Sequence, residues 1–100
     1  MAIRTAEHAA DFVGPIVTLG EVSDAVIDAA RIDNESREIR VLEHAGYVRI
    51  EARGELVLRF DTLGEMLGRN FSMHELERNM PGFSGLIRVD DQQVRFLATK

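Results

Sequence analysis

The sequence has no cysteine and no tryptophan, two prolines, and a single lysine among its twelve basic residues. Without cysteine the chain cannot form a disulfide, a thiolate nucleophile or a thiolate metal site, and we expect a reducing, cytoplasmic setting. No apolar run approaches the roughly 18 residues of a membrane span, and the first residues lack the apolar core of a signal peptide. We therefore expect no membrane partner.

Positive charge is also scarce, since the formal net charge is -5 at pH 7. An acidic surface repels phosphates, so nucleic acid is not expected as a partner. The length of 100 residues and the 45% hydrophobic content are typical of one globular domain. Because no apolar period appears before Phe12, we expect residues 1–11 to form a flexible tail and residues 12–100 to form the domain.

The first half of the domain predicts a strand, a helix and a hairpin. Val13, Ile16 and Val17 surround Gly14-Pro15, and the proline favours a peripheral strand. Thr18-Leu19-Gly20-Glu21 has the spacing of a capping box and predicts a helix start. One apolar stripe follows at helical spacing, formed by Val22, Ala25, Val26, Ala29 and Ala30, and Asp33-Asn34 should end the helix. Two alternating segments, around residues 39–41 and 48–52, predict the hairpin.

The second half repeats this order. After a predicted strand over residues 56–60, Thr62-Leu63-Gly64-Glu65 copies the earlier four residues, and a short helix should end at Gly68. Ser72-Met73-His74-Glu75 is a third capping box, with Pro81-Gly82 beyond the helix that it opens. Residues 87–89 and 94–98 predict a last hairpin. We expect an α+β fold of internally duplicated β-α-β-β units, about 12–53 and 54–99, with mainly antiparallel strands and helices packed on one side.

Residues able to carry chemistry are few and scattered. His8, His44 and His74 show no pair at metal-ligand spacing, and His74 beside Glu75 is better explained by helix capping than by catalysis. The chain contains no Glu-x-x-His motif of the kind that holds di-iron centres in helix bundles. No glycine-rich nucleotide loop follows a strand. We expect no catalytic residue, no metal and no cofactor.

One segment has an unusual composition. Residues 77–85 carry Met80, Pro81 and Phe83 among small residues at the end of a predicted helix. Met80 and Phe83 fit a plug for the hydrophobic core. They fit a protein-docking surface equally well, because such surfaces favour methionine, aromatic residues and arginine over lysine.

Five stretches, taken together in order and spacing, resemble the effector proteins of bacterial multicomponent di-iron monooxygenases. They are Ile32-Asp33-Asn34, residues 45–50, residues 54–58, residues 67–71 and residues 73–77. Residues 13–16 and the short C-terminus make the resemblance closest to the toluene and alkene monooxygenase branch. The departures are Glu35, where many relatives have proline, and Pro81-Gly82, where many have two serines.

The resemblance implies a cofactor-free regulatory protein that is monomeric when free. It implies binding to the di-iron hydroxylase, with effects on hydroxylase conformation, substrate access and the coupling of oxygen activation to hydroxylation or epoxidation of a hydrocarbon. The loop before the last hairpin faces the hydroxylase in relatives, which corresponds here to Asn79, Pro81, Gly82, Phe83 and Ser84.

Two other functions remain open at this point. A doubled ferredoxin-like fold also suits a regulatory domain that binds a small ligand, which would need a pocket lined by convergent polar groups. A cofactor-independent enzyme would need a catalytic pair, and the sequence offers none. The hydrocarbon substrate of a parent monooxygenase is not encoded in this chain.

Overall fold

The structure, a computed structural model, describes residues 11–99, so the predicted tail over residues 1–10 lies outside the described residues. Asp11, which we assigned to the tail, contacts the domain, because its carbonyl accepts a hydrogen bond from the Gly54 amide (2.8 Å). The elements in chain order are β1 (Phe12–Thr18), α2 (Glu21–Asp33), β2 (Arg40–His44), β3 (Tyr47–Arg53), β4 (Glu55–Arg59), α3 (Phe60–Leu67), α4 (Met73–Asn79), β5 (Gly82–Ser84), β6 (Leu86–Val89) and β7 (Gln93–Leu97). Within this part of the chain, no helix is long and apolar enough to cross a membrane.

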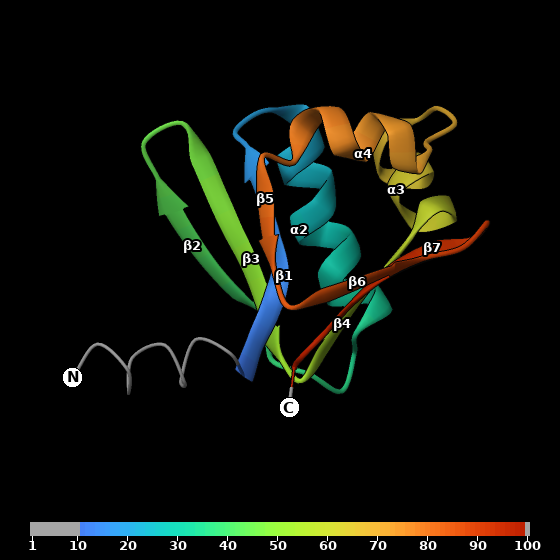
Figure 1. The fold of residues 1–100 in the computed structure, drawn as a ribbon. Helices are drawn as coiled ribbons and strands as arrows, with labels where there is room; N and C mark the ends of the chain where they lie inside the picture. The colour runs from blue at the N-terminus through green and yellow to red at the C-terminus, as the bar shows by residue number, and fades with distance from the viewer. Residues whose placement is uncertain (1–10, 100) are drawn as a thin grey trace.

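The strands form two antiparallel sheets, in the orders β2-β3-β1-β5 and β4-β7-β6. The same pairing occurs twice: β3 lies between β2 and β1, and β7 lies between β6 and β4. The α+β class with antiparallel strands is therefore confirmed, and the strand pairing of the first unit recurs in the second. The second unit is longer, because it includes a second helix, α4, and the strand β5, which joins the first sheet (Figure 1). The division into halves near residues 53 and 54 stays a proposal, and the end of β3 at Arg53 supports it.

Both sheets share one hydrophobic core with α2, which packs against β1, β3 and β4 (Figure 1). The predicted helical stripe is buried throughout, and so are most inward residues of the strands, with Ile87 and Val89 of β6 as exceptions. The buried apolar residues are Val13, Val17, Val22, Ala25, Val26, Ala29, Ala30, Val48, Ile50, Ala52, Leu56, Leu58, Leu63, Phe71, Leu76, Val94 and Phe96. Each sheet thus buries one face, as the alternating sequence pattern predicts.

The prediction that β1 is peripheral is wrong, because β5 pairs with its outer edge and makes it an inner strand. Pro15 is fully buried. Pairing between β1 and β3 skips Gly14 and Pro15, so the missing proline amide leaves no gap in a continuous ladder. At Gly14, an added Cβ would lie 1.9 Å from the Ile50 carbonyl oxygen, which restricts this position to glycine.

The two Thr-Leu-Gly-Glu segments do not cap equivalent helices, contrary to the prediction. Thr18 ends β1 and is exposed, and the start of α2 is capped by Ser23, whose Oγ accepts from the Gly20 amide (2.9 Å) and donates to the Gly20 carbonyl (2.8 Å). Thr62 is buried inside α3, which begins at Phe60 directly after β4. The repeated letters therefore occupy different structural positions, although the strand pairing around them repeats.

The remaining helix signals are correct in position. Gly68 ends α3 in a left-handed conformation (φ 73°), as a C-terminal glycine does in many helices. Ser72 stands at the N-cap of α4, but its side chain makes no capping hydrogen bond. Pro81-Gly82 follows α4 as predicted.

Candidate docking surface

The segment Asn79–Ser84 is ordered into secondary structure rather than forming the predicted loop. Asn79 is the last residue of α4, and its Nδ2 donates to the Glu75 carbonyl at 2.9 Å. Gly82 to Ser84 form β5, which pairs with residues 14–16 of β1. Only Met80 and Pro81 remain between these elements. The segment is therefore joined at one end to α4 and at the other end to the first sheet.

Phe83 points outward, with 41% of its surface exposed, and also contacts the core. Its ring lies 5.9 Å, centroid to centroid, from the ring of Phe96, which is fully buried. This distance is within the range of favourable aromatic pairs. Both sequence hypotheses for Phe83 are thus partly right, because one part of the ring packs on the core and the rest faces solvent.

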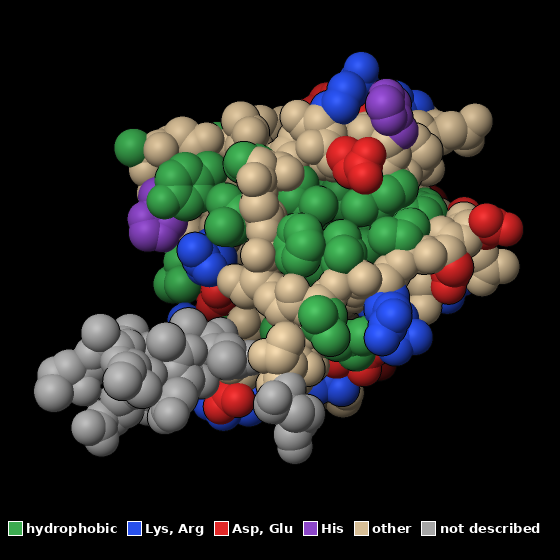
Figure 2. Space-filling model, in the orientation of Figure 1, with side chains coloured by type: hydrophobic (Ala, Val, Ile, Leu, Met, Phe, Trp, Pro, Cys, Tyr) green, Lys and Arg blue, Asp and Glu red, His purple; other side chains and the backbone are tan. Residues whose placement is uncertain are grey.

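α4 precedes β5 in the chain and β6 follows it, and both carry partly exposed apolar side chains. Ile87 and Val89 pair with Phe96 and Val94 of β7, so they lie on the core side of their sheet. Nevertheless Val89 is 49% exposed, and Ile87 is half-buried. Figure 2 shows a continuous apolar area beside β5, below α4 and above the β6–β7 hairpin. We call Met73, Met80, Phe83, Ile87 and Val89 the α4–β6 patch.

Sequence reasoning identified Met80 and Phe83 but missed the contribution of β6. Alternation placed Ile87 and Val89 on the inner face of a strand. It carries no signal for whether another element covers that face, so the exposure of Val89 could not be predicted. The patch depends on non-local packing between α4, β5 and β6.

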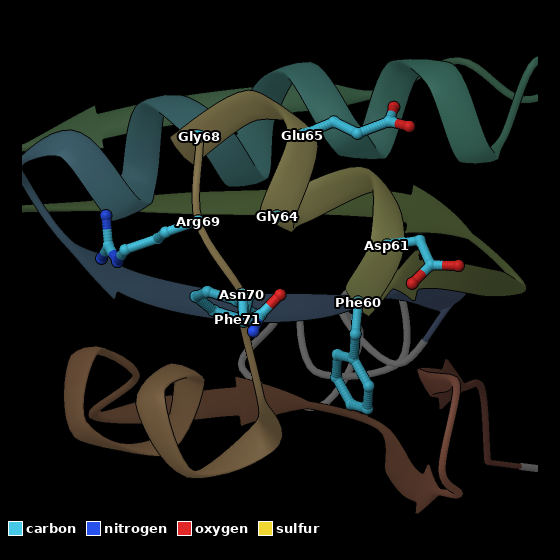
Figure 3. A pocket seen from close by; sticks show the side chains of 8 residues that line it. All are labelled: Phe60, Asp61, Gly64, Glu65, Gly68, Arg69, Asn70 and Phe71. Carbon is cyan, nitrogen blue, oxygen red and sulfur yellow. The ribbon is translucent and has the colours of Figure 1, made fainter.

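A separate hollow of about 540 Å³ lies beside α3 and the turn that follows it (Figure 3). The rings of Phe60 and Phe71 lie on one side of it, and the carboxylates of Asp61 and Glu65 point away from these rings. Arg69 is held by Glu75 and by Glu21 (3.0 Å), and its hydrogen bond to Glu75 is the main cause of a raised pKa of its guanidinium. The polar groups do not converge on one ligand position, as a small-ligand site requires.

The histidine and acidic side chains of residues 11–99 do not gather into a metal site. Within residues 11–99, no three His, Cys, Asp or Glu side chains form a cluster able to hold a metal ion. His44 stacks on Tyr47 with ring centroids 4.9 Å apart. The capping-box pattern predicts that Glu75 bonds the backbone at the start of α4. Its carboxylate instead accepts a hydrogen bond from the Arg69 guanidinium.

The chain is similar to proteins of known role. The model of the MmoB/DmpM family matches residues 11–97. An effector subunit of the alkene monooxygenase system of Xanthobacter autotrophicus (strain ATCC BAA-1158 / Py2) is 35% identical over 86 residues, covering 86% of this chain and 85% of the relative.

Solved structures share the fold. A chain of the phenol hydroxylase–regulatory protein complex superposes with a TM-score of 0.73 at 24% identity, covering 86% of this chain and 97% of that chain. The regulatory protein B of soluble methane monooxygenase superposes with a TM-score of 0.68 at 18% identity, covering 89% of this chain and 66% of its own. With most of the chain matched by one family model, the protein belongs to the MmoB/DmpM family.

Proposed function

We propose that this chain is the effector subunit of a multicomponent monooxygenase. It binds the di-iron hydroxylase and adjusts hydroxylase conformation, substrate access and the coupling of oxygen activation to hydrocarbon hydroxylation or epoxidation, and it is not itself the catalytic component. The single observation that carries this proposal is the family match over residues 11–97. The 35% identity to an alkene monooxygenase effector subunit supports it and favours the alkene branch.

Conformational regulation requires no chemistry in the regulator, only a difference in its affinity for two states of the partner. About 1.4 kcal/mol of preferential binding changes the population ratio of the two states about tenfold. A small domain with a firm core and an apolar docking surface can supply such a difference.

The docking element in this proposal is the segment Asn79–Ser84, with the α4–β6 patch around it. Phe83 is its anchor, since the residue is 41% exposed and can enter a pocket while its ring stays supported by Phe96. Pro81 and Gly82 have little conformational freedom to lose, and β5 is already paired with β1. Binding through this surface would thus carry a small ordering cost.

The same proposal covers the oligomeric state, the cellular location and the partners of the protein. The free protein is a cytoplasmic monomer with the hydroxylase as its partner. Its net charge of -5 disfavours binding to nucleic acid.

Reconstitution with the hydroxylase and electron-transfer proteins of an alkene monooxygenase system tests the proposed function. Product formed per reduced nicotinamide consumed is measured with an alkene and with toluene, across a titration of the chain. We expect turnover and coupling to rise and to saturate near one chain per hydroxylase active site. The matched control is the exposed aromatic variant Tyr47→Ala, outside the docking segment, which should act like the wild type. Unchanged turnover and no detectable binding by calorimetry would contradict the proposal.

A further inference from the structure

A chain of polar contacts crosses the outer face of the four-stranded sheet. On this face Glu51 of β3 lies 3.2 Å from Arg40 of β2 and 3.3 Å from Arg49 of β3. The Arg49 guanidinium also donates to the Ser84 hydroxyl of β5 at 3.0 Å. The contacts therefore run from one edge strand of the sheet to the other.

Glu51 is buried even though its strand position faces away from the core. Its neighbours in sequence, Ile50 and Ala52, fill the core side, and yet Glu51 is only 4% exposed. Among residues 11–99 it is the one buried acidic side chain. A buried carboxylate is costly unless it is paired and hydrogen-bonded. Glu51 therefore requires its two arginines, and in return it restricts where their guanidinium groups lie.

β5, the strand at the end of this series of polar contacts, has the least support in the sheet. β5 has three residues, lies at an edge and forms pairs with β1 alone. Short edge segments with few contacts open at low free energy. Arg49 reaches β5 across β1, where Ile16 pairs with both Arg49 and Gly82. The Arg49–Ser84 bond thus adds a cross-strand tie to a weakly paired strand.

We infer that Glu51 is a positioning residue for β5: it orients Arg49 so that the guanidinium holds Ser84 and fixes the direction in which the adjacent Phe83 projects. The inference rests on the proposed function in one respect, which is that β5 carries the anchor for the hydroxylase. Glu51 itself is distant from the anchor in sequence and acts through Arg49.

The outer face of the other sheet provides a matched control. Glu55 of β4 also lies between two arginines, at 3.1 Å from Arg95 and 3.7 Å from Arg37. It belongs to the sheet that does not contain β5. Glu55→Gln therefore removes a carboxylate that also pairs with two arginines, at a more exposed position, without touching the contacts to Ser84.

The experiment compares Glu51→Gln, Ser84→Ala, the double variant and Glu55→Gln. Amide hydrogen exchange of residues 82–84 in the free protein is measured together with global stability in urea. We expect exchange at β5 to accelerate about tenfold in Glu51→Gln and in Ser84→Ala, as for loss of one charge-assisted hydrogen bond. The double variant should exchange no faster than the faster single variant, because both changes break the same tie. Glu55→Gln should leave β5 exchange unchanged, whatever its global stability.

Hydroxylase affinity is measured on the same four proteins. Glu51→Gln and Ser84→Ala should weaken binding about equally, and Glu55→Gln should not. Unchanged β5 exchange in Glu51→Gln, additive effects in the double variant, or loosened β5 with unchanged affinity would each overturn the positioning role. If the wild type fails to bind while exchange behaves as expected, the proposed function fails and the tie between Glu51 and β5 stands, so the two failures are distinguishable.

Discussion

The ring of Phe83 packs against the ring of Phe96 between the two sheets, with ring centroids 5.9 Å apart. Phe83 belongs to β5 of the first sheet and Phe96 to β7 of the second. The contact therefore supports the proposed anchor, Phe83, on the centre of the core without burying it. A docking residue supported in this way keeps one orientation before the partner arrives.

Phe83→Ala should affect binding more than stability. We expect a stability loss of about 1–2 kcal/mol, since part of the ring and one aromatic contact are removed. Hydroxylase affinity should fall at least tenfold, as for an anchor worth about 2 kcal/mol or more. Urea unfolding and calorimetric titration measure the two quantities on one preparation.

Tyr47→Ala is the control for this variant, because Tyr47 is similarly exposed at 37% and lies on the β2–β3 hairpin. It should leave affinity unchanged. A loss of about 3–5 kcal/mol in stability for Phe83→Ala, with unchanged affinity per folded molecule, would make Phe83 a core residue only.

The strands and the core were predictable because burial imposes a period on the sequence. Val48, Ile50 and Ala52 alternate with polar residues, and each is buried in β3 as predicted. The stripe on α2 follows the same logic at helical spacing. The pairing partner of β5 was not predictable, because a three-residue strand has no measurable period and its partner β1 is distant in the chain.

The errors at the two Thr-Leu-Gly-Glu segments have a physical cause. A capping box is a weak local pattern. At the start of α2, the hydrogen bonds to the backbone of Gly20 come from Ser23, three residues later, and not from Thr18. In the second copy the helix starts at Phe60 without a loop, so Thr62 falls inside it. There its hydroxyl donates to Asp33 Oδ1 at 2.8 Å, a non-local contact that the sequence does not reveal.

The same contrast gives a second prediction. Thr62→Ala should destabilise the protein by about 1–2 kcal/mol, because a buried hydroxyl that bonds a carboxylate is lost. Thr18→Ala should change stability by no more than about 0.5 kcal/mol, since Thr18 is exposed. Thr62→Ser should restore most of the loss. Equal losses in urea for the two alanine variants would restore the capping interpretation.

Asn34 joins the first unit to the second and gives a third prediction. Its Nδ2 donates to the carbonyls of Ala30 (2.7 Å) and Val57 (2.8 Å), and its Oδ1 accepts from the Val57 amide (2.9 Å). Asn34→Ala should cost about 2–4 kcal/mol, because it leaves backbone groups of β4 without partners.

Asn70→Ala, at an exposed position in the turn after α3, is the control and should be near neutral. Hydrogen exchange at Val57 should accelerate in Asn34→Ala and stay unchanged in the control. A stability loss below about 0.5 kcal/mol for Asn34→Ala would remove Asn34 as the link between the two units.

A fourth prediction compares Gly85, which lies between β5 and β6, with Gly46. The comparison distinguishes the cost of backbone strain from the cost of a steric clash. Gly85 and Gly46 both have positive φ, at 97° and 87°. A Cβ at Gly46 would meet no atom within 4 Å, whereas a Cβ at Gly85 would lie 2.6 Å from both the Leu97 carbonyl oxygen and Val13 Cγ1. Gly46→Ala should therefore cost only the conformational strain of about 1–2 kcal/mol.

Gly85→Ala adds overpacking of about 1–3 kcal/mol to the same strain, because Val13 is fully buried and Leu97 contributes backbone. Since Gly85 is where the chain passes from one sheet to the other, the displaced atoms belong to both sheets, and relaxation in one would disturb the other. Thermal unfolding should show a larger fall in Tm for Gly85→Ala than for Gly46→Ala, by roughly 4–8 °C per kcal/mol for a domain of this size. An equal fall in Tm for the two variants would mean that the backbone between β5 and β6 moves to make room for the added methyl group. In that case β5 is held less firmly than its contacts with Phe96 and Arg49 indicate.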